Sequence, residues 1–282
     1  MVALEIGFLK IYWYGVFYFV SFLLGYLFLY YIGKNQILAM HDKVSSFLKE
    51  KLDDLVLMIF LGVLVGGRLA YVLIYNPTHY LANPLDIFAI WQGGMGFFGG
   101  VVGVVLAVYL LTRNYKFQFK DYKVLMDLIV SFVPFGIMLG RIGNFLNQEL
   151  VGKPVEQLPI LIDGRFGLKL VALNLFHVYE KVDLQMRVNT NFIESFGEGF
   201  LILVVLQIVF WKQVKSGYKN PGIISGIFLV MYGIVRFLVE FLREYGPSEF
   251  IGILTKTQYM MIGFVVIGAY LIWTSYRGKA NN

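Results

Sequence analysis

The sequence predicts an all-α polytopic membrane protein with about seven transmembrane helices. Hydrophobic residues make up 58% of the 282-residue chain, and charged residues only 15%. Apolar runs long enough to cross a bilayer recur along its whole length. They cover roughly residues 11–33, 54–75, 97–112, 122–145, 198–214, 222–242 and 257–275. Basic residues gather in every second connection between these runs, which is the third sign of a multi-pass protein.

The distribution of basic residues predicts the orientation. Lysines or arginines follow the first, third, fifth and last runs, whereas residues 76–91 contain none. Cytoplasmic loops carry the excess of lysine and arginine, so we expect the N-terminus outside and the C-terminus inside. The formal net charge of +6 therefore reflects topology, and we expect no nucleic-acid partner.

The chain divides into three predicted segments. Residues 1–146 hold the first four spans and a re-entrant glycine-rich stretch, residues 147–197 form a small extracytoplasmic head, and residues 198–282 hold the last three spans. The short apolar pieces 158–162 and 168–175 predict strands in the head. The first run is too long and too poor in basic flanking residues for a signal peptide, so we expect a permanent span.

Several local patterns predict departures from straight helices. Apolar residues at helical spacing from Asp42 to Asp54 predict an amphipathic stretch on the cytoplasmic surface. The pair Gly62 and Gly66 predicts close helix packing. Prolines and glycines between Asn76 and Gly96 exclude one regular helix there, and Pro134 should kink the fourth span.

A polar stretch ends the fourth span. Arg141 follows an apolar run, where an arginine costs about 2.5–3.5 kcal/mol to insert and so needs a partner or a wet cavity. Arg141, Asn144 and Gln148 share one helix face if the run stays helical. A cation with neutral amides suits a phosphate group. The alternative is a structural pair in which Arg141 and an acidic residue lock two helices.

A second polar stripe crosses the sixth span. Tyr232, Arg236 and Glu240 step by four residues, and Arg243 lies three further on. Arg236 and Glu240 can form an ion pair at this spacing. We expect Glu149 and Glu240 to orient the arginines and to compensate their charge. A purely structural salt-bridge ladder is the alternative interpretation.

The fourth-span stretch resembles the signature of the prolipoprotein diacylglyceryl transferase family of bacterial inner-membrane enzymes. The matching residues are Gly140, Arg141, Gly143, Asn144, Phe145, Asn147, Glu149 and Gly152. The sixth-span stripe also matches the family closely. Similar matches occur at Trp13-Tyr14-Gly15, at Gly66-Gly67-Arg68 and in the glycine-rich stretch 91–100.

The resemblance implies a reaction. Phosphatidylglycerol donates its diacylglyceryl group to the lipobox cysteine thiol of a preprolipoprotein, glycerol phosphate is released, and no cofactor or metal is implied. The implied catalytic residues are Arg141, Arg236, Tyr14, Asn144, Glu149 and Glu240. The implied substrate-binding residues are Arg141, Arg236, Arg68, Gly143, Gly152, Tyr232, Arg243, Gly94 and Gly99. The resemblance also implies a multi-pass protein of the bacterial inner membrane, among membrane lipids.

The chain departs from the family at several positions. Phe98 stands where the family usually has a histidine proposed as a general base, and a phenyl ring cannot take a proton. The family's His-Pro and Tyr before the fifth span are replaced by Val188, Asn189 and Ile193. An inactive homologue that binds anionic phospholipid, as a carrier or an assembly factor, is therefore the alternative function.

Two further residues have competing interpretations. Tyr14 lies at the outer end of the first span, where tyrosines commonly form an aromatic belt, whereas the resemblance implies a functional role. Asp127 matches a family aspartate and could pair with an arginine or lock two helices together. In the absence of a histidine at position 98, we expect the arginines, with Tyr14, to favour formation of the thiolate.

Overall fold

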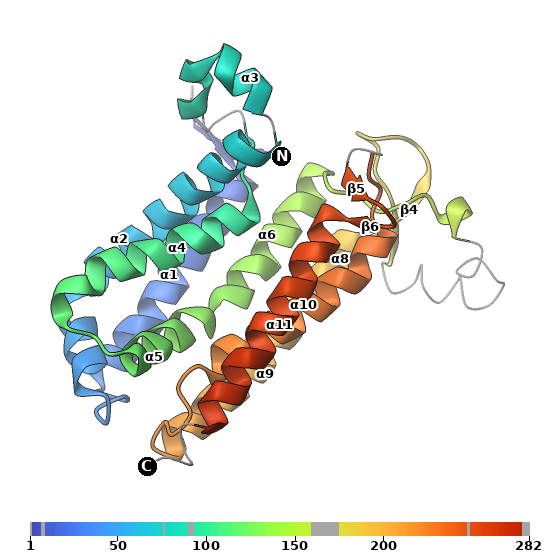
Figure 1. The fold of residues 1–282 in the computed structure, drawn as a ribbon. Helices are drawn as coiled ribbons and strands as arrows, with labels where there is room; N and C mark the ends of the chain where they lie inside the picture. Colours follow the sequence, from blue (N-terminus) through green and yellow to red (C-terminus); the bar gives the residue numbers. More distant parts are fainter. Residues whose placement is uncertain are drawn as a thin grey trace. The chain divides into compact units, whose positions relative to one another are not determined.

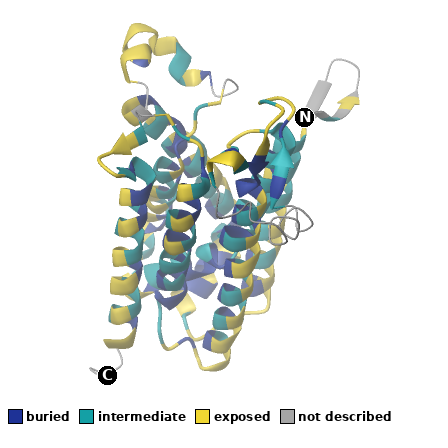
Figure 2. Cartoon of the chain, turned by 90° about the vertical axis from the view of Figure 1, so that its right-hand side faces the viewer, coloured by how far each residue is buried: buried dark blue, intermediate teal, exposed yellow. Residues whose placement is uncertain are grey.

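The computed structural model describes residues 2–6, 9–75, 77–89, 93–158, 175–246 and 249–277. Seven of the described helical segments are long and apolar enough to cross a membrane: Trp13–Lys34, Asp42–Ile74, Phe97–Tyr115, Phe119–Asn147, Thr190–Lys215, Ile223–Leu242 and Lys256–Arg277. The seven predicted spans are therefore confirmed as helices. Exposed positions follow one another along the outward sides of the long helices (Figure 2), as expected of surfaces that face lipid. The orientation and the division into three segments remain predictions.

The chain forms two compact units, Met1–Leu27 with Lys123–Asn282, and Phe28–Tyr122. The elements appear in Figure 1. The larger unit holds β1 (Val2–Ile6), β2 (Leu9–Tyr12), the start of α1 (Trp13–Lys34), most of α5 (Phe119–Val130), α6 (Val133–Asn147), η5 (Val155–Gln157), β3 (Phe176–Val178), β4 (Met186–Val188), α8 (Thr190–Glu194), η7 (Ser195–Leu201), α9 (Ile202–Lys215), α10 (Ile223–Val239), η8 (Glu240–Leu242), β5 (Phe250–Ile251), β6 (Leu254–Thr255) and α11 (Lys256–Arg277). The smaller unit holds the rest of α1, α2 (Asp42–Ala70), η1 (Tyr71–Tyr75), α3 (Pro77–Ala82), η2 (Pro84–Phe88), α4 (Phe97–Thr112) and η4 (Arg113–Tyr115).

In the smaller unit, glycines let two helices approach closely. Helices α2 and α4 lie side by side (Figure 1). A β-carbon on Gly62 would lie 2.7 Å from the carbonyl oxygen of Gly103, and one on Gly66 would collide with that of Gly99. Small residues allow such backbone contact between membrane helices. The close packing predicted from Gly62 and Gly66 is confirmed.

The amphipathic stretch after Asp42 continues directly into the second span. Helix α2 begins at Asp42, and only Lys51, with φ −132° and ψ 22°, departs from helical geometry inside it. Val44, Phe47 and Leu48 on its apolar face are buried. The prediction of a helical amphipathic stretch is correct, but the second helix starts twelve residues before the predicted 54–75 run, because the hydropathy pattern detects only the apolar part.

Breaks fall where the sequence predicted them. The fourth span divides into α5 and α6, with Pro134 in the first turn of α6. Proline cannot donate the backbone hydrogen bond that a continuous helix needs. Between residues 76 and 96, the described residues form α3 and η2 in place of one long helix. Of the apolar pieces 158–162 and 168–175 predicted as strands, residues 159–162 and 168–174 lie outside the described residues.

In the larger unit, α10 is the most buried span, and α11 lies beside it (Figure 1). A β-carbon on Gly226 would lie 2.8 Å from the carbonyl oxygen of Gly268, so these helices also touch through glycines. Three antiparallel hairpins, β1–β2, β3–β4 and β5–β6, occur among the described residues. In β3–β4, Phe176 pairs with Val188 and Val178 with Met186.

Asp127 of α5 caps the N-terminus of α10. Its Oδ2 accepts a hydrogen bond from the backbone of Gly222 at 2.7 Å, and its Oδ1 accepts bonds from the backbone and hydroxyl of Ser225 at 2.8 and 2.7 Å. Burial, with the neighbouring carboxylate, raises the pKa of Tyr218 well above its ordinary value, so its hydroxyl stays protonated and donates to Asp127 at 3.4 Å. Asp127 thus joins two helices and pairs with no arginine among the described residues, which agrees with the helix-locking alternative.

Replacing Asp127 by alanine should lower the free energy of unfolding by about 2 kcal/mol or more, because it leaves buried donors at a helix N-terminus without an acceptor. Thermal unfolding in detergent measures this. Asp54→Ala is the matched control, since its ion pair with Lys51 is half exposed and such pairs contribute about 0–1 kcal/mol. Equal stability of the two variants would contradict the capping role.

Candidate functional site

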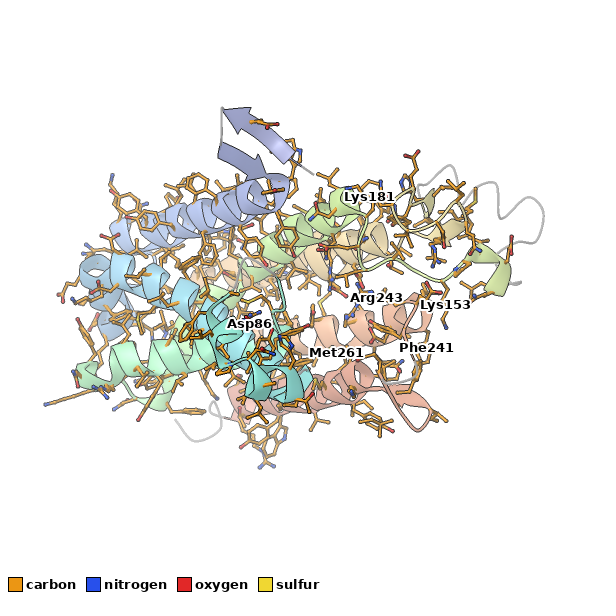
Figure 3. All side chains as sticks on the ribbon, turned by 90° about the horizontal axis from the view of Figure 1, so that it is seen from above. Asp86, Lys153, Lys181, Phe241, Arg243 and Met261 are labelled. Atoms are coloured by element: carbon orange, nitrogen blue, oxygen red, sulfur yellow. The ribbon has the colours of Figure 1, made fainter. Side chains whose placement is uncertain are left out.

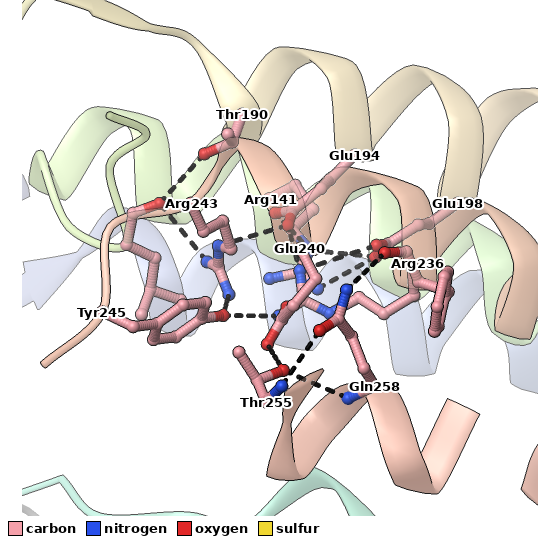
Figure 4. Close-up of polar contacts among 12 residues, drawn as sticks. Arg141, Thr190, Glu194, Glu198, Arg236, Glu240, Arg243, Tyr245, Thr255 and Gln258 are labelled. Carbon is pink, nitrogen blue, oxygen red and sulfur yellow. Dashed lines mark hydrogen bonds and ion pairs between the residues drawn. The ribbon is translucent and has the colours of Figure 1, made fainter. Parts of the chain in front are cut away.

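Six charged side chains meet in the interior of the larger unit (Figure 4). We call Arg141, Glu194, Glu198, Arg236, Glu240 and Arg243 the ion-pair cluster. Arg141 comes from α6, the first two glutamates from α8 and η7, and the others from α10, η8 and the residue after η8. Its three positive and three negative groups balance. The cluster joins the fourth, fifth and sixth spans.

Glu194 is the centre of the cluster. Its side chain is completely buried, and all three arginines reach it. Arg141 Nε lies 3.2 Å from Oε2, Arg243 Nε lies 3.3 Å from Oε1, and Arg236 Nη1 donates to the same Oε1. A buried charge is costly unless it is paired and hydrogen-bonded. The single negative charge of Glu194 therefore compensates part of the positive charge of three guanidiniums.

Glu198 lies four residues later and contacts two of these arginines, Arg141 and Arg236. Its Oε2 accepts from Arg141 Nη2 at 2.9 Å and from Arg141 Nε at 3.3 Å. Its Oε1 is buried, has no hydrogen-bond partner, and lies 3.9 Å from Arg236 Nη1. Glu198 sits in the π-helical stretch η7, an irregularity that often accompanies functional sites. Glu194 Oε2 and Glu240 Oε2 also form no hydrogen bond among the described residues, but each has an arginine nitrogen closer than 3.9 Å, at 3.2 and 2.8 Å, so Glu198 Oε1 has the longest ion-pair contact of the three.

Glu240 connects the cluster to the seventh span. Its Oε2 lies 2.8 Å from Arg236 Nη2, which confirms the ion pair predicted from their spacing. Its Oε1 accepts from the Thr255 hydroxyl at 2.9 Å. Gln258, at the start of α11, accepts from the Thr255 backbone and donates to the carbonyl of Phe237. The sixth span and the hairpin before the seventh are thereby joined at the site.

Tyr245 fixes two of the arginines from outside the spans. Its hydroxyl oxygen accepts from Arg236 Nη2 and from Arg243 Nη1, both at 3.2 Å. Burial is the main cause of its raised pKa, which keeps the phenol neutral. Arg243 also donates to the carbonyl of Leu150 at 3.3 Å. Arg243 is thus committed to protein groups at all three nitrogen positions.

Arg141 is the most accessible arginine of the cluster. Its side chain is 14% exposed, against 7% for Arg236 and 6% for Arg243. Within the described part of the chain, its Nη1 forms no hydrogen bond. One turn further along α6, Asn144 is buried, and its Oδ1 has no partner there. Tyr232 is buried near Arg141 and Glu198, close enough to interact with both electrostatically.

The end of the signature forms a loop that packs against the cluster. Gln148 and Leu150 have positive φ, and residues 152–154 then run between the chain at 187–188 and the chain at 242–243. Gly152 pairs with Arg243, and a β-carbon on Gly152 would collide with the carbonyl of Val188. Lys153 and Arg243 are labelled in Figure 3. Only glycine fits at position 152.

Arg187 holds this loop in place. It lies on β4, donates to the carbonyl of Gly152 at 3.0 Å, and pairs with Asp183 and Glu244, each at 2.5 Å. The guanidinium hydrogen bond lowers the pKa of Asp183 below its ordinary value, so the pair persists at neutral pH. No sequence pattern indicated this role for Arg187.

Tyr14 and Glu149 lie beside the signature helix. The Tyr14 ring packs on Gly143, whose β-carbon would come within 2.8 Å of it, so Gly143 makes room for the ring. The Glu149 backbone accepts from Asn191 at 2.9 Å and donates to the carbonyl of Asn144. Among the described residues, the Glu149 carboxylate pairs with no arginine. Glu194 and Glu198 take the compensating role that was expected of it.

Arg68, Gly94 and Gly99 belong to the smaller unit, as does Phe98. Arg68 donates to the carbonyls of Asp86, Ile87, Ala89, Gly93 and Gly94, so it organises the connection before α4. Gly94 has φ +80°, and Gly99 abuts the backbone of Gly66. Phe98 lies in the first turn of α4. The substrate-binding roles of Arg68, Gly94 and Gly99 remain predictions.

Two residues central to the site, Glu194 and Glu198, were not assigned roles from the sequence. Both are acidic residues four positions apart at the beginning of the fifth span, and a carboxylate at membrane depth calls for a cationic partner. That spacing was the available signal. The family resemblance is weakest just before these positions, at Val188, Asn189 and Ile193, so it implied no role for either glutamate.

Replacing Glu194 by glutamine should lower the free energy of unfolding by about 3 kcal/mol or more, because removing one partner leaves buried charges uncompensated. Thermal unfolding in detergent measures the loss. Glu156→Gln, an exposed carboxylate on η5, should change stability by less than about 0.5 kcal/mol. If Glu194→Gln were as stable as this control, Glu194 would not be the charge centre of the cluster.

Comparisons with known proteins agree with the geometry. The family description of prolipoprotein diacylglyceryl transferase matches residues 1–274. A phosphatidylglycerol–prolipoprotein diacylglyceryl transferase of Polynucleobacter necessarius is 37% identical over 285 residues, covering 99% of this chain and 96% of that protein. The proteins of the same name from Rickettsia felis and Bordetella bronchiseptica are 34% and 36% identical, covering 97% and 96% of this chain and 96% and 93% of their own lengths. The chain therefore belongs to the prolipoprotein diacylglyceryl transferase family.

Proposed function

We propose that this protein transfers a diacylglyceryl group from phosphatidylglycerol to the lipobox cysteine of preprolipoproteins. The observation that carries the proposal is the meeting of Arg141 and Arg236, from the fourth and sixth spans, on the carboxylate of Glu194. From the sequence, these two arginines, each costly to insert into a membrane, were predicted to bind one anionic group between them. The names of the relatives supply the donor and the acceptor.

Arg141 is the proposed first contact of the lipid phosphate. Within the described part of the chain its Nη1 forms no hydrogen bond, and its side chain is 14% exposed, so it can bind a further anion. A guanidinium presents a planar fork that matches two phosphate oxygens. Asn144, one turn further along α6, has a buried Oδ1 without a hydrogen bond among the described residues, so its amide can turn toward a ligand. Arg236 is connected to Arg141 through the carboxylates of Glu194 and Glu198, with which both arginines pair.

The proposed reaction is a displacement at carbon. The cysteine thiolate attacks the diacylglycerol carbon bonded to the phosphate oxygen, a carbon–sulfur bond forms, and the carbon–oxygen bond breaks with its electron pair on the oxygen of glycerol phosphate. Positive groups fixed in a low-dielectric site stabilise the charge that develops on this oxygen. The same field favours the thiolate form of the incoming cysteine. Tyr14 packs on Gly143, and its hydroxyl is proposed to assist the arginines in favouring the thiolate.

The proposed setting is the bacterial inner membrane, with the N-terminus outside. The lipid would enter sideways from the bilayer, and the signal peptide would approach from the outer face. The basic residues of alternate loops support this orientation. The head formed by residues 147–197, which contains the β3–β4 hairpin and Arg187, would then lie on the acceptor side.

A second function is supported by specific residues. Phe98 provides no proton acceptor, and Val188, Asn189 and Ile193 replace residues usual in the family. An inactive homologue that only binds anionic phospholipid would keep the ion-pair cluster and lose these groups. Complementation of a strain depleted of its own transferase separates the two functions, because only the enzyme restores growth.

Arg141→Lys should lose transfer as severely as Arg141→Ala, because lysine keeps the charge and loses the planar fork. Transfer of the diacylglyceryl group from phosphatidylglycerol to a lipobox peptide in detergent measures this. The loss should be at least about 100-fold, in line with removal of one preorganised donor. Full activity of the lysine variant would mean that charge alone suffices.

Phe98→His should change transfer only modestly, whereas Arg236→Ala should abolish it. The thiol has a pKa only about 1.5 units above neutrality, and nearby guanidiniums can supply that difference. Rates against pH for both variants provide the measurement. If the natural protein were inert at every pH and Phe98→His made it active, the lipid-binding alternative would replace the transferase.

A further inference from the structure

The balance of charge in the ion-pair cluster constrains how an anion can bind there. Three arginines and three glutamates leave no surplus positive charge, and every carboxylate in the cluster has a side chain with 0% exposure. A phosphodiester carries one negative charge. If it joined the cluster unchanged, the buried site would hold one uncompensated negative charge, which a low-dielectric interior strongly disfavours.

One carboxylate is better placed than the others to relieve this excess. Glu194 has arginine partners on both oxygens, and Glu240 has Arg236 on one oxygen and Thr255 on the other. Glu198 Oε2 accepts from Arg141, but its Oε1 lies 3.9 Å from Arg236 Nη1. The corresponding ion-pair distances are shorter for the other two carboxylates, 3.2 Å from Glu194 Oε2 to Arg141 Nε and 2.8 Å from Glu240 Oε2 to Arg236 Nη2. Among the described residues, each of the three carboxylates has one buried oxygen that forms no hydrogen bond, and in Glu198 this oxygen is Oε1, the one with the longest ion-pair contact. A proton on Oε1 would convert this unsatisfied acceptor into a donor.

The surroundings of Glu198 support a change of protonation. Arg141 faces it from α6, Arg236 and Tyr232 face it from α10, and Glu194 faces it from one turn earlier on its own span. The neighbouring negative charge of Glu194 favours the neutral acid, whereas the two arginines favour the carboxylate. An anion bound at Arg141 would compete for the same guanidinium and add a second negative neighbour. Both effects favour protonation.

We infer that Glu198 takes up one proton when the phosphodiester of an anionic phospholipid binds at Arg141. The phosphate replaces the Glu198 carboxylate on Arg141 Nη2, and the protonated Glu198 turns its O–H toward a phosphate oxygen. The cluster then keeps its neutrality with the lipid in place. This inference rests on the proposed function, because it assumes that the ligand of Arg141 is a lipid phosphate.

The stored proton also has a use in the proposed reaction. Breaking the carbon–oxygen bond places an electron pair on the phosphate oxygen and makes the departing glycerol phosphate a dianion. Transfer of the Glu198 proton to that oxygen releases the product as a monoanion. The carboxylate then returns to Arg141. The proton lost by the cysteine thiol goes to water, so uptake and release balance over one turnover.

Calorimetry with the purified full-length protein in detergent tests the inference. The probe is dihexanoyl phosphatidylglycerol, titrated at one pH in two buffers of different ionisation enthalpy. We expect an uptake of about one proton per lipid bound, and an affinity that falls by up to about tenfold per unit as the pH rises. Binding without proton uptake, or an affinity independent of pH, would overturn the inference and leave the proposed function intact.

Variants and a second lipid make the test specific. Glu198→Gln should bind the probe with an affinity that changes less than about twofold with pH, and with no proton uptake. Glu156→Gln, exposed on η5, should behave like the natural protein. If Glu198→Gln did not fold, the measurements on the natural protein would still decide. Dihexanoyl phosphatidylcholine has a headgroup that carries its own cation, so its binding should cause no proton uptake. Failure of phosphatidylglycerol to bind at any pH would overturn the proposed function as well.

Discussion

The carboxylate of Glu194 is the interaction on which the larger unit depends. It is completely buried, and it contacts arginines from two distant parts of the chain, Arg141 on α6 and the pair Arg236 and Arg243 at the end of the sixth span. None of these cations could remain at that depth without a partner. The cost of burying them is offset only when the spans pack together. The same requirement that assembles the helices therefore also assembles a group of guanidiniums.

An ion-pair cluster of this kind supports two interpretations, structural and functional, and the details distinguish them. Arg243 is fully engaged with Glu194, Tyr245 and the carbonyl of Leu150, as a structural arginine would be. Arg141 Nη1 forms no hydrogen bond within the described residues, and Arg141 is the most exposed of the three arginines. Asn144 keeps a buried oxygen unpaired. Among the described residues, both of these groups, Arg141 Nη1 and Asn144 Oδ1, lie one turn apart on α6, where a ligand would complete them.

The sequence predicted the spans well because each rests on a local property, apolar length, that tertiary contacts do not alter. It also predicted the Arg236–Glu240 pair, which needs only helical spacing. It assigned Glu149 the role that Glu194 and Glu198 fill, because the partners of Arg141 lie more than fifty residues away in sequence, on another span. Spacing along one helix cannot reveal such a partner. Arg187 was missed for the same reason, since its contacts join segments that meet only after folding.

We propose that Arg141 and Arg236 act as one anion-binding unit through the carboxylates that they share. A double-mutant cycle with Arg141→Lys, Arg236→Lys and both together, scored by the affinity for phosphatidylglycerol, tests it most directly. Residues in one ion-pair network show interaction free energies of about 0.5–3 kcal/mol, whereas independent residues add within about 0.5 kcal/mol. We expect a coupling of at least about 1 kcal/mol. Strict additivity of the two substitutions would contradict the account.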